Sequence, residues 1–211
     1  KAALGSYIPF PTLSPPEMKS FHSIEGSIVA PQGFLAAGLF CDVKRLGTGK
    51  GSNKGRKRDL AVIVSEVPAK AAGMFTTNQI CAAPVKLCVD HIASNNGNAQ
   101  AVVINSGNAN ACTGPRGLKD AHEMAALLAD ELLLQPADVL VGSTGRIGLP
   151  LPMPNIRAGI REIVKELDNT PSAAHHAAEA IMTSDTRAKE IAVEFKLGGK
   201  TARLGGIGKG A

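Results

Sequence analysis

The sequence predicts an α/β protein built in layers, of the α+β kind, because short apolar runs that suit strands are interleaved with longer amphipathic stretches that suit helices. With 211 residues and 44% hydrophobic content, the chain can bury a core without help from disulfides or metals. It also lacks the internal repeats that indicate a solenoid or a propeller. We therefore expect an N-terminal arm followed by one main domain.

The predicted arm covers residues 1–25. Prolines at positions 9, 11, 15 and 16 interrupt any regular pattern there, and proline is disfavoured inside helices and central strands. We expect the arm to wrap over a surface, with regular structure beginning near Gly26. The main domain then extends over residues 26–211.

Four short apolar runs have the composition of strands that are buried on both faces. They are residues 60–64, 85–89, 101–104 and 139–141. Residues 192–197 instead alternate between apolar and polar types, which predicts a strand with one wet face. Residues 201–204 can pair with that strand through a turn at Gly198 and Gly199.

Three segments repeat apolar or small residues at helical spacing, namely residues 118–134, 156–167 and 171–182. Each has a signal for the start of a helix. These signals are Gly117 with Asp120 in the first turn, Pro154 with Asn155, and Thr170 as N-cap before Pro171.

A basic run at residues 44–58 supplies much of the net charge of +5. It contains no aromatic residue that could stack on bases, and aromatic residues make up only 3% of the chain. We therefore expect an exposed, mobile loop without a catalytic role, and no nucleic-acid partner.

The remaining composition argues against several classes of site. The cysteines at 41, 81, 88 and 112 match no metal or redox spacing, which predicts buried, reduced thiols. The histidines form no metal-binding pattern, so we expect no metal site. No apolar stretch approaches the ~20 residues that span a bilayer, so we expect no membrane partner.

Polar, glycine-rich turns adjoin the predicted strands, where backbone donors can collect at the edge of a sheet. In residues 142–148, backbone N–H groups and the Thr144 hydroxyl are the donors that an oxyanion hole requires, although such a turn also occurs without catalysis. The asparagine-rich residues 105–114 suit either a binding loop or a structural turn. In residues 205–210, glycines surround Lys209, which suits contact with an anion.

Familiar catalytic motifs are missing. Residues 47–52 suggest a phosphate loop, but Lys44 stands where glycine is needed and Gly51 follows Lys50. The sequence has no GxSxG elbow, and no serine or cysteine has an obvious histidine and aspartate partner. It therefore offers oxyanion donors without a nucleophile.

Four motifs follow one another along the chain: residues 105–114 (NSGNANACTG), 143–148 (STGRIG), 181–186 (IMTSDT) and 206–210 (GIGKG). In this order they resemble the α chain of the glutamate N-acetyltransferase family, also called ornithine acetyltransferase, of arginine biosynthesis. The similarity covers residues 26–211. It implies a sandwich of sheets and helices similar to that of N-terminal-nucleophile enzymes, with this chain as the α-chain catalytic domain.

The resemblance also implies self-cleavage of a precursor at an Ala-Thr bond. The freed threonine heads a separate β chain and serves as the nucleophile, with its own α-amine as base. In the family the glycine-lysine loop continues for a few residues before that bond. We therefore expect Ala211 to lie short of the cleavage point.

Matched residue by residue, Thr144 and Gly145 correspond to the family's oxyanion-hole pair. Thr183 corresponds to a threonine that contacts the substrate, and Lys209 to the lysine that binds it.

Two positions depart from the family pattern. Arg146 stands where valine is usual, next to the predicted oxyanion hole, and could disturb its electrostatics. Ser184 stands where a second threonine is usual.

The implied reaction is a ping-pong acetyl transfer. N-acetylornithine acetylates the threonine, ornithine leaves, and glutamate takes the acetyl group to give N-acetylglutamate. The resemblance implies no cofactor or metal, although some members also use acetyl-CoA as a donor. The implied partner is the β chain from the same precursor, in an (αβ)2 heterotetramer.

Two other functions remain open from the residues alone. A self-processing aminopeptidase or amidase of similar architecture would pass its acyl group to water. A non-catalytic subunit would use Lys209 and the asparagine-rich loop to hold a small anionic metabolite. The start at Lys1 rather than methionine and the proline-rich arm favour a plastid, the chloroplast stroma, over the cytoplasm or the mitochondrial matrix.

Overall fold

The computed structural model describes residues 21–44 and 57–210. Residues 1–20 of the predicted arm, residues 45–56 of the basic run and Ala211 lie outside this description. Within the predicted arm, Phe21–Ser23 forms strand β1, which pairs antiparallel with a later strand, so regular structure begins before Gly26.

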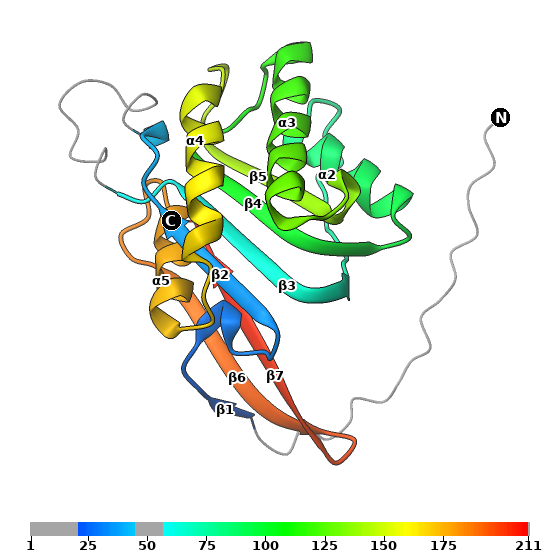
Figure 1. Cartoon of the computed structure of the whole chain (residues 1–211), viewed down its shortest axis with the longest axis vertical. Coiled ribbons are helices and arrows are strands. Elements are labelled where there is room, and N and C mark those ends of the chain that lie inside the picture. The colour runs from blue at the N-terminus through cyan, green and yellow to red at the C-terminus, as the bar shows by residue number, and fades with distance from the viewer. Residues whose placement is uncertain (1–20, 45–56, 211) are drawn as a thin grey trace.

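A four-stranded sheet forms the centre of the molecule (Figure 1). Its order is β2-β3-β4-β5, and only the last pair of strands is parallel. The strands are β2 (Phe34–Leu39), β3 (Leu60–Lys70), β4 (Asn98–Asn108) and β5 (Val139–Arg146). The parallel pairing of β4 with β5 brings the ends of both strands, with two of the recognised motifs, to the same edge.

A second, three-stranded sheet has the order β1-β6-β7 and is antiparallel throughout. Strands β6 (Lys189–Leu197) and β7 (Lys200–Gly208) form a hairpin. Its turn contains Gly198 and Gly199, whose φ angles of 55° and 77° favour glycine. The predicted pairing through these glycines is confirmed.

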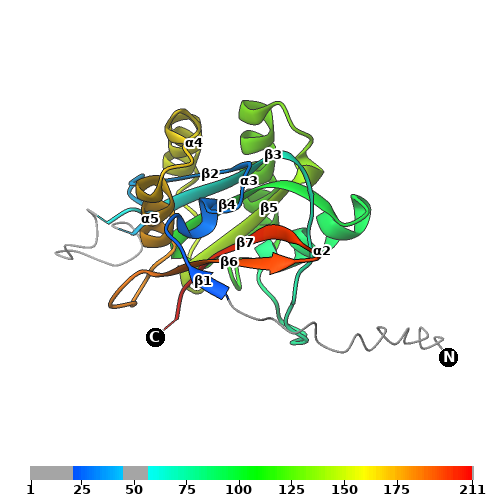
Figure 2. The ribbon, with the colours of Figure 1, turned by 90° about the horizontal axis from the view of Figure 1, so that it is seen from below.

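Helices cover both faces of the four-stranded sheet. Helices α2 (Ala83–Ser94), α3 (Gly114–Leu132) and α4 (Met153–Ile163) share one buried cluster with β3, β4 and β5. Helix α5 (Pro171–Ala180) packs on the other face, together with the three-residue helix η1 (Ser27–Val29). Figure 2 shows α4 on one side of the central sheet and strands β6 and β7 on the other. Short 3-10 helices η3 (Pro136–Asp138) and η4 (Val164–Glu166) complete the described elements.

Strand β3 shows how the sequence divides the two cores. Successive side chains of a strand point to opposite faces. Leu60, Val62 and Val64 accordingly lie in the cluster with α2, α3 and α4. Ala61 and Ile63 pack in the cluster with α5. A run of consecutive apolar residues is therefore what a strand between two packed layers requires.

Helix α5 lies unusually close to β2, and this explains its alanine content. A Cβ atom at Gly38 would lie 2.1 Å from the carbonyl oxygen of His176, so the helix backbone contacts the strand directly. Residues with longer side chains would hold the two backbones apart. The alanines on the buried side of α5 are 173, 174, 177, 178 and 180. The predicted N-cap is also confirmed, because Thr170 Oγ1 accepts a hydrogen bond of 3.3 Å from Ala173 N.

The prediction for residues 85–89 was wrong, because this run lies in helix α2 rather than in a strand. The buried residues of α2 include Pro84, Leu87, Cys88 and His91, which have helical spacing, whereas Val89 is 41% exposed. Pro84 in the first turn is the helix-start signal that distinguishes the two interpretations. The β-branched valines suggested a strand, but tertiary packing decided otherwise. Strand β2 was not predicted, because its sequence, FLAAGL, has no β-branched residue.

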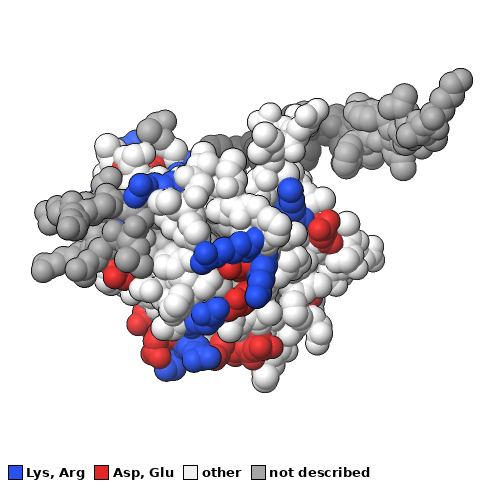
Figure 3. Space-filling model, turned by 90° about the horizontal axis from the view of Figure 1, so that it is seen from above, with Lys and Arg blue, Asp and Glu red and all other residues white. Residues whose placement is uncertain are grey.

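Charged residues of both signs are mixed on the surface. On the face seen in Figure 3, Lys and Arg side chains lie beside Asp and Glu side chains. Helices α4 and α3 are joined by an ion pair, in which Arg157 Nε lies 2.5 Å from Glu123 Oε1. None of the helices in residues 21–44 and 57–210 combines the length and apolar character needed to cross a bilayer.

Candidate active site

The predicted oxyanion-hole residues lie at the end of β5, where backbone packs against backbone. Thr144 pairs with Ser106, and Gly145 pairs with Gly107. Gly145 has a φ of 130°, and a Cβ atom there would lie 2.3 Å from the carbonyl carbon and oxygen of Gly107. Gly145 must therefore be glycine for both conformational and steric reasons.

Gly107 must also be glycine, because the backbone at residues 43–44 packs against it. Its φ is 126°, and an added Cβ would lie 2.9 Å from Lys44 N and from the carbonyl carbon of Val43. The segment at 43–44, the end of β4 and the end of β5 are thus stacked in close contact. This stack fixes the position of Gly145 relative to the centre of the sheet.

The direction of the Gly145 N–H group can be inferred from the strand pairing beside it. The Arg146 carbonyl oxygen accepts a hydrogen bond of 2.8 Å from Ala109 N, so it is turned towards the β4 side. Successive residues of a strand alternate in the direction of their polar groups. We therefore expect the N–H of Gly145 to face the outer edge of β5, which is the last strand of its sheet among the described residues. Gly145 is exposed and Thr144 is half-buried, so both are accessible from that edge.

The asparagine-rich loop is a structural support rather than a binding surface. The amide nitrogens of Asn105, Asn108 and Asn110 donate to the carbonyl oxygens of Asn108, Pro150 and Gly117, at 2.9, 2.7 and 2.8 Å. All three asparagines are buried. Their side chains tie the loop to itself, to helix α3 and to the segment after β5, which favours the structural interpretation of this motif.

A buried serine connects this edge to the turn that contains Thr183. Ser106, the strand partner of Thr144, donates its hydroxyl hydrogen bond to the carbonyl oxygen of Ala180 at the end of α5. Thr183 follows three residues later and is half-buried. The end of the sheet and the turn after α5 are therefore held together by one side chain.

Asp185 is the main contact residue that the sequence analysis missed. Its buried carboxylate accepts hydrogen bonds from Thr183 N at 3.1 Å, from Gly210 N at 2.7 Å and from Lys189 Nζ at 2.8 Å. The hydrogen bond from Lys189, followed by those from the two backbone N–H groups, holds the pKa of Asp185 well below its usual range. An aspartate within the recognised IMTSDT motif was the available signal.

The structure thus brings Thr183 and the Lys209 segment to a common anchor. Lys209 directly follows β7 and is exposed. The cavity of about 330 Å³ that Thr183 lines is bordered by Arg58, Glu179 and Arg187, but not by Thr144 or Lys209. A pocket shared by Thr144, Thr183 and Lys209 therefore stays a prediction.

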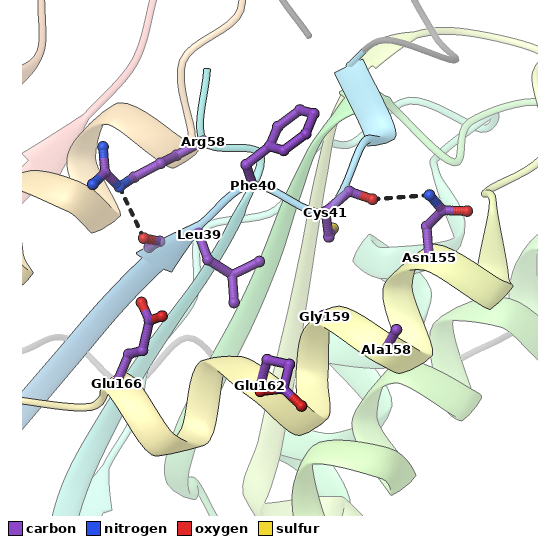
Figure 4. A pocket seen from close by; sticks show the side chains of 10 residues that line it. Leu39, Phe40, Cys41, Arg58, Asn155, Ala158, Gly159, Glu162 and Glu166 are labelled. Atoms are coloured by element: carbon purple, nitrogen blue, oxygen red, sulfur yellow. Dashed lines mark hydrogen bonds between the residues drawn. The ribbon is translucent and has the colours of Figure 1, made fainter. Parts of the chain in front are cut away.

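A second cavity lies between β2 and α4 and contains none of the predicted site residues (Figure 4). It measures about 650 Å³, and its polar lining includes Glu162 and Glu166. Arg58 Nε donates to the Gly38 carbonyl at 3.0 Å, and Asn155 Nδ2 donates to the Cys41 carbonyl at 3.0 Å. These hydrogen bonds brace the wall of the cavity.

Lys44 contradicts the expectation of a solvated basic run. It is only 3% exposed, and its Nζ donates to the carbonyl oxygen of Arg58. The carboxylate of Asp59 accepts hydrogen bonds from Cys41 N, Val43 N and Lys44 N at 2.7, 2.8 and 3.0 Å. Burial, partly offset by Asp59, lowers the pKa of Lys44 to about 8. The prediction was wrong for Lys44, because the groups that accept its hydrogen bonds belong to Arg58 and Asp59, at and just beyond the end of the run. Lys57 is exposed, as expected, and residues 45–56 lie outside the described residues.

The cysteines are all free, but they are not all buried. Cys88 is buried, Cys41 and Cys81 are half-buried, and Cys112 is exposed, so the expectation was wrong for Cys112. Burial, reinforced by Asp59, raises the pKa of the Cys41 thiol, which keeps it protonated. Among the described residues, no three His, Cys, Asp or Glu side chains are grouped to hold a metal ion.

The two-sheet fold with glycines at the paired ends of β4 and β5 defines a layered α/β protein of the ornithine acetyltransferase type. The chain superposes on a crystal structure of the arginine biosynthesis bifunctional protein ArgJ from Bacillus halodurans with a TM-score of 0.81 and 39% identity, over 91% of this chain and 95% of that one. It superposes on ornithine acetyltransferase from Mycobacterium tuberculosis, solved in complex with ornithine, with a TM-score of 0.80 and 36% identity. That match covers 91% of this chain and 96% of the other.

Residues 45–211 match the family model described as the ArgJ family, and the chain belongs to this family. The arginine biosynthesis bifunctional protein ArgJ of Shouchella clausii is 44% identical over 193 residues, which is 92% of this chain and 44% of that protein. The protein of the same name from Symbiobacterium thermophilum is 46% identical over 188 residues, 89% of this chain and 44% of its own length. The chain therefore spans less than half the length of these relatives. The predicted family and fold class are confirmed.

The buried Lys44 predicts a pH dependence of stability. Its pKa is about 8 in the folded protein and about 10.4 in an unfolded chain. Between these values the unfolded chain binds more protons, so the free energy of unfolding should rise with pH. In Lys44→Met this rise should be smaller, as measured by urea unfolding between about pH 7 and pH 10. The exposed Lys86, changed to Met, is the control and should keep the wild-type slope. Parallel curves for wild type and Lys44→Met would contradict the assignment.

Proposed function

We propose that this chain is part of an acetyltransferase of arginine biosynthesis, which moves an acetyl group from N-acetylornithine to glutamate. The observation that carries the proposal is the likeness to an ornithine acetyltransferase solved with ornithine, at a TM-score of 0.80 and 36% identity. The names of the matched relatives, arginine biosynthesis bifunctional proteins, agree with it.

The nucleophile in this proposal comes from outside the chain. The N-terminal threonine of a β chain, released by self-cleavage of a common precursor, attacks the acetyl carbonyl of N-acetylornithine. The threonine's α-amine accepts the hydroxyl proton and passes it to the leaving amine of ornithine. The amine of glutamate then attacks the acetyl-threonine ester, and the proton that it loses returns through the α-amine to the threonine oxygen. This step regenerates the hydroxyl and releases N-acetylglutamate. Each half of this ping-pong reaction passes through a tetrahedral oxyanion.

Thr144 and Gly145 are the proposed donors to that oxyanion. The accessible outer edge of β5 and the expected direction of the Gly145 N–H support this role. Donors that are fixed before the reaction stabilise developing charge without a reorganisation cost. The stacked glycine backbone at this point makes such rigidity physically reasonable.

Thr183 and Lys209 are the proposed substrate-binding residues. Ornithine and glutamate both carry an α-carboxylate, and an exposed lysine beside glycines can reach a carboxylate or the acyl carbonyl. The common hydrogen-bonding partner of Thr183 N and Gly210 N supports a single site for the two residues.

The finer parts of the proposal concern partners and location. We propose a β chain from the same precursor, an (αβ)2 heterotetramer and possible use of acetyl-CoA as a donor. Placement in a plastid also stays a prediction. The burial of Asn105, Asn108 and Asn110 weighs against the non-catalytic subunit, because their amide nitrogens already donate to backbone carbonyl oxygens of this chain.

The complete protein, incubated with N-acetylornithine carrying a labelled acetyl group and with glutamate, tests the function. Label should appear in N-acetylglutamate and should require glutamate. Label released only as acetate would instead identify the amidase-like reaction. A parallel incubation with labelled acetyl-CoA and glutamate decides whether this second donor is used.

Thr144→Ala should lower kcat by about 10² to 10³, the usual effect of losing one oxyanion-hole donor. The fold should be retained, because Thr144 is only half-buried. Steady-state kinetics with circular dichroism as a check on folding measures both effects. Thr201→Ala, at an exposed position in β7, is the matched control. Unchanged turnover in Thr144→Ala would remove Thr144 from the oxyanion hole.

Lys209→Met should raise KM for both amino-acid substrates or lower kcat/KM, because it removes the cation while keeping a side chain of similar length. A gel that scores self-cleavage, run beside the kinetics, separates substrate binding from processing. The control is Lys200→Met, at the exposed start of β7. Wild-type constants for both substrates would show that Lys209 does not bind them.

A further inference from the structure

Asp185 joins three parts of the chain that are separated in sequence. Its carboxylate accepts from Thr183 N in the turn after α5, from Lys189 Nζ at the start of β6, and from Gly210 N beyond the end of β7. The side chain of Asp185 is 1% exposed, whereas that of Lys189 is 41% exposed. The buried partner of this ion pair is therefore the carboxylate, and its orientation is set by protein donors.

The hydrogen bond from Gly210 holds a segment that has already left the β-sheet. The strand pairing of β7 with β6 ends at Gly208, which pairs with Lys189. Lys209 and Gly210 follow and are both exposed. Among the described contacts of this segment, the 2.7 Å hydrogen bond from Gly210 N to Asp185 Oδ1 is what ties it back to the fold. Gly210 N belongs to the peptide unit that directly follows Lys209, so this bond also restricts the backbone of the lysine.

We propose that Asp185 is a positioning residue that fixes Thr183 and Lys209 relative to each other and thereby sets the geometry of substrate binding. The inference rests on the proposed function of those two residues. Asp185 itself is not placed in contact with substrate. It acts by accepting hydrogen bonds from two backbone N–H groups, that of Thr183 and that of Gly210.

The chemistry of the site calls for a carboxylate. All three described partners are donors, and an ionised carboxylate only accepts hydrogen bonds. An asparagine would offer one accepting oxygen, and its NH2 group would face a donor. Asp185→Asn should therefore lose at least one of the three contacts while changing the side-chain volume little. Lys189→Met removes the charged partner but leaves both backbone N–H groups in place.

The test is steady-state kinetics on the complete protein with N-acetylornithine and glutamate. Asp185→Asn should raise KM for both substrates and lower kcat/KM by about 10- to 100-fold, since small displacements of positioning groups can have effects of this size. Lys189→Met should have a smaller effect. The control is Glu194→Gln, which breaks the more exposed ion pair with Arg203 Nε at 3.0 Å on the same hairpin and should behave as wild type.

A double-variant cycle distinguishes positioning from a general effect on the fold. If Asp185 acts through Lys209, Asp185→Asn should lower kcat/KM less in a Lys209→Met background than in wild type. Wild-type KM values in Asp185→Asn, or fully additive effects of the two substitutions, would overturn the inference.

Amide hydrogen exchange keeps the proposal testable if Asp185→Asn fails to fold. In the wild-type protein the exposed Gly210 amide should exchange slowly because it is hydrogen-bonded to a buried carboxylate, and fast exchange there would refute the inference. If the proposed acetyl transfer itself is wrong, a different result is expected. In that case the wild-type protein itself forms no N-acetylglutamate, while the exchange at Gly210 still reports on the contact.

Discussion

Direct packing of backbone against backbone at Gly107 and Gly145 is the constraint on which the candidate site depends. At both positions an added Cβ would overlap main-chain atoms of the neighbouring segment, so no side chain can separate the layers. The result is a stack that begins at residues 43–44, passes through the end of β4 and finishes at the end of β5. Because close-packed backbone has little freedom to shift, Thr144 and Gly145 are held in place by the centre of the sheet rather than by a flexible loop.

Two buried aspartates organise the segments around this stack. Asp59 accepts hydrogen bonds from the N–H groups of Cys41, Val43 and Lys44, which holds the segment at 43–44 against Gly107. Asp185 does the same for the turn after α5 and the segment after β7. A buried charge is costly unless it is fully hydrogen-bonded, so each carboxylate favours one arrangement of its donors. Hydrophobic contact alone would allow more variation, because it has no direction.

The sequence predicted those features whose cause is local. The strand at β6, the glycine turn before β7 and the cap at Thr170 all depend on neighbouring residues, and all were confirmed. The single wet face predicted for β6 was not, because Val193, Glu194 and Phe195 are all half-buried and Leu197 is exposed. Helix α2 was misassigned because a run of five residues around Leu87 fits either period, and packing against β5 settles it. The motif marked Asp185 as a residue of interest, but neither its partner Gly210, 25 residues away, nor the contact between Lys44 and Arg58, 14 residues apart, could be predicted from local sequence.

The distribution of burial separates the residues that support the site from those proposed to act in it. Asn105, Ser106 and Asp185 are buried and hydrogen-bonded within the chain, whereas Gly145 and Lys209 are exposed. These supporting residues therefore have partners within the described part of the chain, whereas Gly145 and Lys209 are open to other molecules. Catalytic donors are most effective when their orientation is fixed before the substrate arrives. An arrangement of this kind can be built by the chain alone and then used by a nucleophile from another part of the protein, which suits relatives more than twice as long as the region matched here.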